Sequence, residues 1–365
     1  MSDQSNYRVE IIDSFEQWTK VSRDWNELLA QSRGNTVFLT WEWLYSWAEC
    51  FFEDTRTLFI LIVYKEDNIV GIAPWYIHRQ KNGILTTKHI RFLGTPEAGS
   101  DYLDIIAKKG QERNVTQRLY DFLLREASSR WDCCTLQDIP SDSLFLLHFM
   151  EKIEDDGKYA EIRPESYCPT VHLPQKSEEL FAVYGSHRRL QYRRHLKLLR
   201  KEGELHHTTH SGGDVSSALE EFCSLYEDKN KKHDKMVRPF LTRYASLGTT
   251  DSILQIDLLR SNGKLVAGTL HLKYGNTLSM YLMVVDKEYH PQVSVGNLLV
   301  GMCLSNAIDN GYAVYDFLKG PEPYKFHWAD GGRSSVNLCY YQKNVAPILL
   351  AAVKFLKYTG KIILR

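Results

Sequence analysis

The fold of the second half of the chain is decided by Thr277–Phe317, TLSMYLMVVDKEYHPQVSVGNLLVGMCLSNAIDNGYAVYDF. Apolar side chains recur at every second position from Leu278 to Val284, which predicts a half-buried strand. After a loop, apolar pairs recur every four residues between 296 and 310, which predicts a helix that ends at Asn310 and Gly311. A short apolar run then stops at Asp316. The stretch therefore predicts a strand, a loop, a helix and a strand, in that order.

The segment before this stretch, Ser252–Tyr274, predicts two strands joined by an Asn-Gly turn. Thr57–His78 in the first half has the same layout, and each hairpin is followed by a third strand, a helix (111–128 or 296–310) and another strand. This repeated order predicts an α/β fold with two tandem domains, each a mixed α+β sheet flanked by helices. The alternative is that two hairpins look alike by chance.

Length and proline placement predict where the domains divide. At 365 residues the chain exceeds the size at which one hydrophobic core usually stops growing. Three prolines between Pro164 and Pro174 indicate a linker, so we expect domains at 1–165 and 166–345. Residues 346–365 predict an amphipathic helix that docks on its own domain or, alternatively, makes peripheral contact with a membrane surface.

Composition excludes several classes of protein. The 45 Lys and Arg residues balance 45 Asp and Glu residues, so bulk charge gives no reason to expect a nucleic-acid partner. Seven scattered cysteines predict reduced thiols and a cytoplasmic protein. The polar N-terminus does not resemble a signal peptide, and no apolar run approaches the roughly 20 residues that span a bilayer.

The loop before the predicted helix at 296–310 is a candidate anion site. Ser294–Asn297 follow a strand and open the helix, where free backbone N–H groups and the positive end of the helix dipole attract phosphate. Gly296 would let a ligand approach the backbone closely. The loop lacks the lysine of a Walker loop and the paired glycines of a dinucleotide fingerprint.

A basic segment, SHRRLQYRRHLKLLRKEG (186–203), is a second candidate. Read as a helix from Ser186, it places Arg189 and Arg193 on one stripe with two further cations. Arginines there are candidate contacts to a phosphorylated cofactor or an anionic substrate. The alternative is a solvated amphipathic helix.

Candidate catalytic groups lie in DFLKGPEPYKFHWAD (Asp316–Asp330). Asp316 ends a strand, and two prolines fix a turn beyond which Tyr324 and Lys325 project over the same cleft. Asp316 could act as a base or orient an acceptor, Tyr324 could act as an acid, and Lys325 could hold an anionic group. The alternatives are that Asp316 caps its own turn, Lys325 forms a salt bridge with it, and Tyr324 only packs.

Four segments carry a resemblance to the GNAT-fold acetyltransferase domain of bacterial cellulose and exopolysaccharide biosynthesis proteins: SHRRLQYRRHLKLLRKEG, GKLVAGTLHL, VGNLLVGMCLSNAIDNGYAVYDF and GPEPYKFHW. In the first half, FLTWEWLYSWAE and GSDYLDII are similar to segments of the same family. This family is related to the Fem-type peptidyl transferases, which also carry two GNAT units. The resemblance implies two tandem GNAT-like domains, of which the first lacks a recognisable cofactor loop.

The resemblance also implies a reaction and a donor. An amine or hydroxyl of a sugar, amino sugar or related polysaccharide precursor would attack the thioester of acetyl-CoA or another acyl-CoA directly. The donor's pantetheine and diphosphate would bind at the strand-loop-helix turn, along Val284, Val285, Gln292, Ser294, Val295, Gly296 and Asn297. Two alternatives are an aminoacyl transferase that uses charged tRNA, as the Fem relatives do, and a non-catalytic partner in polysaccharide synthesis.

Two further groups of polar residues invite a functional interpretation. Asp101 and Asp104 in GSDYLD are candidates for acceptor binding, and a structural turn is the alternative. His206, His207 and His210 have no acid or cysteine at ligand spacing, so we expect a solvated loop and no metal.

Overall fold

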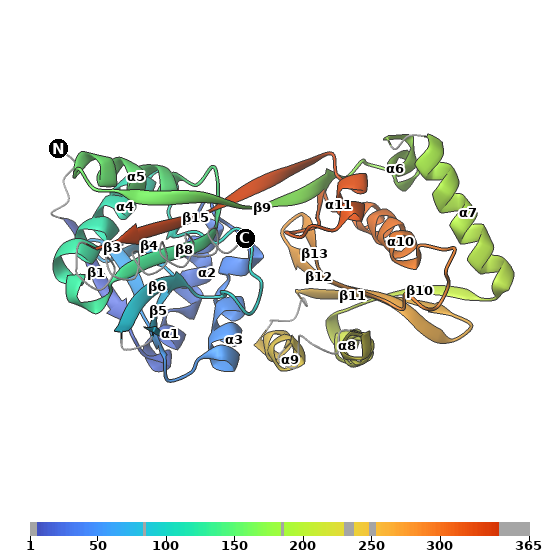
Figure 1. The fold of residues 1–365 in the computed structure, drawn as a ribbon, viewed down its shortest axis with the longest axis horizontal. Coiled ribbons are helices and arrows are strands. Elements are labelled where there is room, and N and C mark those ends of the chain that lie inside the picture. The colour runs from blue at the N-terminus through green and yellow to red at the C-terminus, as the bar shows by residue number, and fades with distance from the viewer. Residues whose placement is uncertain (1–5, 83–84, 184–185, 230–236, 248–252, 343–365) are drawn as a thin grey trace, which may run out of the picture. The chain divides into compact units, whose positions relative to one another are not determined.

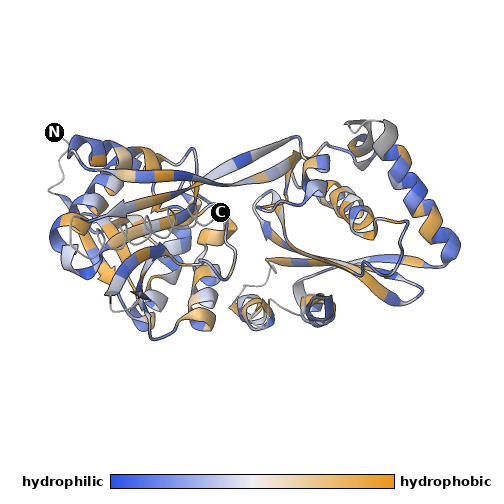
Figure 2. Cartoon of the chain, viewed as in Figure 1, coloured by the Kyte–Doolittle hydropathy of each residue, from blue (hydrophilic) through white to orange (hydrophobic). Residues whose placement is uncertain are grey.

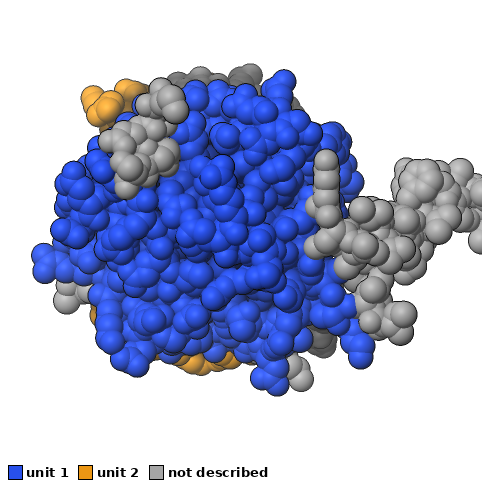
Figure 3. Space-filling model, turned by 90° about the vertical axis from the view of Figure 1, so that its left-hand side faces the viewer, with its two compact units in different colours: residues 1–166, 334–365 blue, residues 167–333 orange. Residues whose placement is uncertain are grey.

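The computed structural model describes residues 6–82, 85–183, 186–229, 237–247 and 253–342 (Figure 1). The chain divides into two compact units: Met1–Ser166 with Ser334–Arg365 form unit 1, and Tyr167–Arg333 form unit 2 (Figure 3). Residues 334–342, which we had expected in the second domain, therefore belong to unit 1. The predicted helix at 346–365 lies outside the described residues.

Unit 1 contains two sheets and a tryptophan-rich core. One sheet has the order β1-β3-β4-β7, and the other runs through β15, β8, β6, β5 and β2. Trp43 and Trp47 are fully buried, as expected for core residues. The strands are β1 (Tyr7–Ile12), β2 (Arg56–Leu58), β3 (Ile60–Lys65), β4 (Asn68–Ala73), β5 (Trp75–Asn82), β6 (Leu85–Phe92), β7 (Ile106–Ala107), β8 (Cys133–Pro140) and the unit's parts of β9 (Ala160–His172) and β15 (Gly331–Tyr341). The helices are α1 (Phe15–Lys20), α2 (Ser22–Ala30), η2 (Val37–Leu39), α3 (Trp41–Phe51), α4 (Glu112–Asp121), η3 (Phe122–Glu126), η4 (Ser128–Arg130) and α5 (Leu144–Asp155).

Unit 2 is a mixed sheet with helices on both faces, as the sequence predicted. Its strand order is β10-β11-β12-β13-β14-β9; β13 and β14 are parallel, and the other neighbours are antiparallel. Helix α10 covers one face, and α8 and α9 lie along the other (Figure 1). The strands are β10 (Leu205–Ser211), β11 (Leu254–Ser261), β12 (Lys264–Tyr274), β13 (Thr277–Val285) and β14 (Val314–Asp316). The helices are α6 (Ser177–Val183), α7 (Ser186–Glu202), η5 (Gly212–Asp214), α8 (Val215–Lys229), α9 (Val237–Leu247), α10 (Val295–Asp309) and α11 (Pro323–Trp328).

The structure changes two sequence interpretations. The chain passes from unit 1 to unit 2 between Ser166 and Tyr167, inside the proline-rich stretch, but most of this stretch forms strand β9. Within β9, only Thr170–His172 pair with the three-residue strand β14, so neither Pro164 nor Pro169 has to donate a hydrogen bond to it. The cluster at His206, moreover, is not a loop but part of strand β10, which pairs with β11 along its whole length.

Helix α10 and helix α7 contrast in polarity, as Figure 2 shows. The apolar side chains of α10 pack into the core against β12, β13 and β14. Leu199 of α7 belongs to the same core, and Tyr192, Leu196 and Leu198 pack against it. A Cβ at Gly301 would lie only 2.4 Å from a ring atom of Tyr192. Gly301 therefore lets the two helices approach. Within the described part of the chain, no helix combines the length and apolarity needed to cross a bilayer.

Candidate active site

Unit 2 contains a cavity of about 1210 Å³ beside the carboxyl end of β13. Its wall comprises residues 280–285 of β13, most of the loop that follows, and the first turn of α10. Helices α7, α8 and α11 contribute Gln191, His195, Tyr226, Lys229 and Tyr324, among others. Strand, loop and helix thus meet around one cavity, where the free N–H groups of a helix's first turn can face a ligand.

The residues that the resemblance assigns to the donor all line this cavity: Val284, Val285, Gln292, Ser294, Val295, Gly296 and Asn297. They lie at the end of one strand and in the loop and helix start that follow it, which explains why sequence reasoning could group them.

The first turn of α10 is held in place from two sides. A Cβ added at Gly296 would lie 2.9 Å from Cγ2 of Val285, so only glycine lets the helix start this close to β13. On the other side, Nε1 of Trp328 donates a hydrogen bond to Oδ1 of Asn297 at 2.6 Å, which connects α10 to α11. Gly296 therefore has a packing role in addition to the close ligand approach that we predicted.

Gly296→Ala is expected to destabilise the protein by about 1–3 kcal/mol, because the added methyl group overpacks the contact with Val285. It should also weaken ligand binding at the first turn of α10. Urea denaturation measures the change in free energy of unfolding. Gly213→Ala is the matched control, because nothing lies within 4 Å of a Cβ at that position. Equal stability of the two variants would contradict this account of Gly296.

Helix α11 brings Tyr324 and Lys325 to the cavity, as predicted for these two residues. The Lys325 side chain is buried; its Nζ donates to the carbonyl oxygen of Lys319 at 2.7 Å and pairs with Oε2 of Glu322 at 3.0 Å. Lys325 thus holds the turn before its own helix. Burial, together with the nearby Glu322 carboxylate, raises the pKa of Tyr324, so its phenol is protonated at neutral pH.

Asp316 is buried, and its Oδ1 accepts a hydrogen bond from the backbone N–H of Leu318 at 2.8 Å. Leu318 has a left-handed backbone, with φ of 55°. Asp316 is not among the residues that line the cavity. Its carboxylate therefore stabilises the turn between β14 and α11, which is one of the two interpretations that the sequence left open.

Comparison with known proteins agrees with this geometry. Residues 186–326 match the family model described as an acetyltransferase (GNAT) domain. Unit 2 carries a GNAT acetyltransferase domain. The protein is accordingly an acyltransferase by class. No curated protein matches the sequence.

Two solved structures share the fold across both units. A conserved protein of unknown function from Bacteroides thetaiotaomicron has a TM-score of 0.55 at 11% identity, with 91% of this chain and 99% of that chain covered. The crystal structure of FemX has a TM-score of 0.56 at 10% identity, with 88% and 96% covered. At such low identity these similarities show the fold alone.

Helix α7 meets the cavity of the GNAT domain with a different face from the one that we predicted. Arg189 and Arg193 are exposed and do not line the cavity, whereas Gln191 and His195, one turn apart, do. Burial and the neighbouring charge of Arg194 lower the pKa of His195, so its imidazole is neutral near pH 7. Helical periodicity could have found this face once Leu199 was known to be buried and Tyr192 half-buried.

Sequence reasoning also missed a charged cluster where β13 of the GNAT domain ends. The carboxylate of Asp286 is buried and pairs with Nζ of Lys264 at 2.8 Å and of Lys229 at 3.1 Å. These hydrogen bonds, chiefly that from Lys264, hold the pKa of Asp286 below its usual value. Asp286 and Lys229 line the cavity, so the cluster connects β12 and α8 to its wall.

Asp101 and Asp104 belong to unit 1 and are both buried. Oδ1 of Asp104 accepts a hydrogen bond from the N–H of Ile105 at 2.8 Å, as in a structural turn. The acceptor-binding role of these two residues stays a prediction.

Proposed function

We propose that the GNAT domain transfers an acyl group from acetyl-CoA or another acyl-CoA to an amine or hydroxyl of a sugar, amino sugar or related cell-envelope precursor. The observation that carries the proposal is the cavity where the end of β13 meets the first turn of α10. Its volume is about 1210 Å³, whereas common small-molecule pockets measure roughly 300–1,000 Å³. A large cavity is what an extended acyl-CoA donor and its acceptor require when they bind together. The acceptor class rests on the sequence resemblance.

The donor would bind with its diphosphate at Ser294–Asn297, where backbone N–H groups and the helix dipole favour negative charge. Val284 and Val285 would contact its pantetheine arm. Exposed Arg189 and Arg193 would contact an anionic part of a substrate that extends beyond the cavity.

In the reaction, the acceptor nitrogen or oxygen attacks the thioester carbonyl carbon and loses its proton, and the carbon–sulfur bond breaks. We assign the proton-accepting role to His195, the neutral imidazole in the cavity wall. Tyr324, whose phenol is protonated and lines the cavity, donates a proton to the departing thiolate. Asp316 and Lys325 act as positioning residues for the turn that carries Tyr324.

A thermal-shift experiment with acetyl-CoA, longer acyl-CoAs and free CoA tests the donor. A ligand at about 100 times its dissociation constant should stabilise the protein by roughly 2.7 kcal/mol. The Gly296→Ala variant should show a smaller shift than Gly213→Ala at equal ligand concentration. Absence of any shift with every thioester would overturn the proposal, and a shift with charged tRNA in its place would favour the aminoacyl-transferase alternative.

A further inference from the structure

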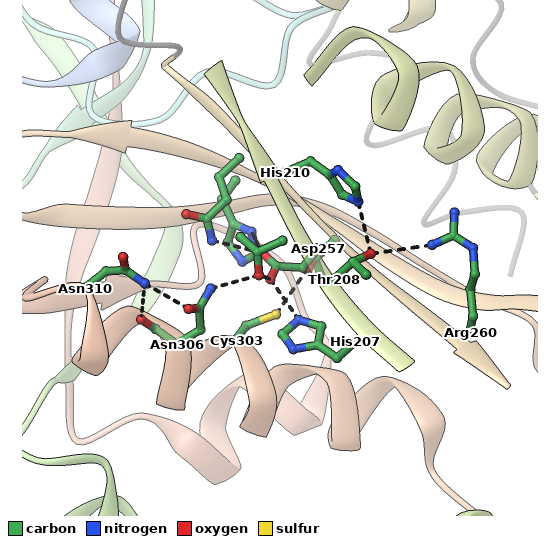
Figure 4. A network of polar contacts seen from close by, with 12 residues as sticks. His207, Thr208, His210, Asp257, Arg260, Cys303, Asn306 and Asn310 are labelled. Carbon is green, nitrogen blue, oxygen red and sulfur yellow. Dashed lines mark hydrogen bonds and ion pairs between the residues drawn. The ribbon is translucent and has the colours of Figure 1, made fainter. Parts of the chain in front are cut away.

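Three side chains of metal-binding type converge between α10 and the sheet of unit 2, away from the residues that line the cavity (Figure 4). They are His207 of β10, Asp257 of β11 and Cys303 of α10, and one ligand atom from each lies within 4.8 Å of the other two. The Asp257 and Cys303 side chains are buried. The His207 side chain is 20% exposed, so the cluster has a route to solvent.

We propose that His207, Asp257 and Cys303 bind a Zn²⁺ ion. An imidazole nitrogen, a carboxylate oxygen and a thiolate sulfur are all zinc ligands, whereas Ca²⁺ and Mg²⁺ prefer oxygen ligands alone. His207 Nε2 lies 2.8 Å from Asp257 Oδ1. Zinc bonds of about 2.0–2.3 Å place ligand atoms roughly 3–4 Å apart, so shifts of about 1 Å would suffice. A water would complete a tetrahedral shell.

A Zn²⁺ ion would balance the charge of this site. Without a cation Cys303 is a neutral thiol, and its thiolate would be costly in the core because it loses its hydration. With Zn²⁺, one carboxylate, one thiolate and a neutral imidazole, the net charge of the site is zero. On binding, the sulfur–hydrogen bond of Cys303 is replaced by a zinc–sulfur bond, and the proton passes to solvent.

The residues around the three ligands are arranged to orient them. Gln255 Nε2 donates to Asp257 Oδ2 at 2.9 Å, and His271 Nδ1 lies 3.2 Å from the same oxygen. Around the sulfur, Thr269 Oγ1 lies 3.4 Å from Cys303 Sγ. Such outer contacts normally fix the orientation of metal ligands. Asp257 could therefore bind zinc through Oδ1 and keep its Oδ2 contacts.

The ion would connect α10, whose first turn lines the cavity, to strands β10 and β11. Its role would be structural, and the proposal does not depend on the acyl-transfer activity. The competing explanation is that the same residues form a purely hydrogen-bonded network, in which Thr209 Oγ1 and His207 donate to Asp257 without an ion.

Metal analysis of the full-length protein, purified without chelator, tests the proposal. About one equivalent of zinc is expected, and re-addition of Zn²⁺ to chelator-treated protein should raise the melting temperature. Cys303→Ser and His207→Gln should each bind zinc at least 10-fold more weakly. His210→Gln should bind like the wild type, because His210 lies on the opposite face of β10 and contacts Thr208 instead.

Cobalt substitution gives a readout that needs no variant. Co²⁺ bound to the wild-type protein should show a thiolate-to-metal charge-transfer band, which tests Cys303 even if Cys303→Ser does not fold. Because the protein contains six other free cysteines, loss of the band in folded Cys303→Ser would assign it. The proposal is overturned if the wild type neither retains zinc nor shows the band, or if Cys303→Ser binds metal as the wild type does.

Discussion

Tyr324→Phe is expected to lower kcat by about 10²-fold, because a positioned general acid contributes roughly 10²–10⁴ to a rate. The KM for the donor should change little. The phenylalanine ring can keep the edge contact with Phe317, whose centroid lies 6.3 Å away, so only the proton donor is removed. Release of free thiol from the acyl-CoA that gives the largest thermal shift, in the presence of a panel of amines and sugars, measures both constants.

The pH dependence of kcat gives a second readout for Tyr324. Burial raises its pKa, so the phenol remains protonated above the value near 10 at which an exposed tyrosine ionises. The loss of activity at alkaline pH that is due to Tyr324 should therefore begin above pH 10, and Tyr324→Phe should lack it. Tyr312→Phe is the control: burial raises the pKa of Tyr312 as well, but this residue does not line the cavity. Unchanged kcat in Tyr324→Phe would show that the phenol only packs.

Asp257→Ala is expected to have the largest effect on stability, a loss of about 3–5 kcal/mol in the free energy of unfolding. The side chain is fully buried and accepts hydrogen bonds from Thr209, Gln255 and His207. Its removal leaves these donors and His271 without their shared acceptor in the core, with or without a bound ion.

Urea denaturation of Asp257→Ala at neutral pH measures this loss. Asp309→Ala is the matched control, because Asp309 is an exposed aspartate of α10 in the same unit and should change stability by no more than about 0.5 kcal/mol. A loss below 1 kcal/mol in Asp257→Ala would mean that the network contributes little to the core and would remove the reason for this prediction.

Local periodicity accounts for the part of the fold that could be predicted. The strand-loop-helix-strand order of Thr277–Phe317 appears in the structure as β13, α10 and β14. Apolar residues two or four positions apart define these elements without reference to the rest of the chain. The residues that the resemblance assigns to the donor, from Val284 to Asn297, could be grouped for the same reason, because a strand end and the helix start that follows it are close in the sequence.

The sequence analysis missed features of the fold that depend on contacts between segments far apart in the chain. Strand β9 lies between β14 and β15 in the sheet, both of which come more than 140 residues later in the chain, and its prolines hid the strand from a reading of local sequence. The face of α7 that meets the cavity depends on where Tyr192 packs against α10. Asp316 is a different case, because the hydrogen bond from the backbone N–H of Leu318, two residues later, is local and supports the cap over the base.

The amino-acid sequence by itself determined the strand, helix and strand of Thr277–Phe317, the helix start that lines the cavity, and the presence of Tyr324 and Lys325 beside it. Only the tertiary structure decided that His195 enters the cavity wall, that Asp316 holds a turn, and that His207, Asp257 and Cys303 meet. Helical and strand periods act over a few residues, whereas the positions of His195 and of the His207, Asp257 and Cys303 cluster depend on sheet register and helix packing between segments about 50 or more residues apart. The Asp316 contact is local, but the sequence does not show which backbone N–H its carboxylate reaches.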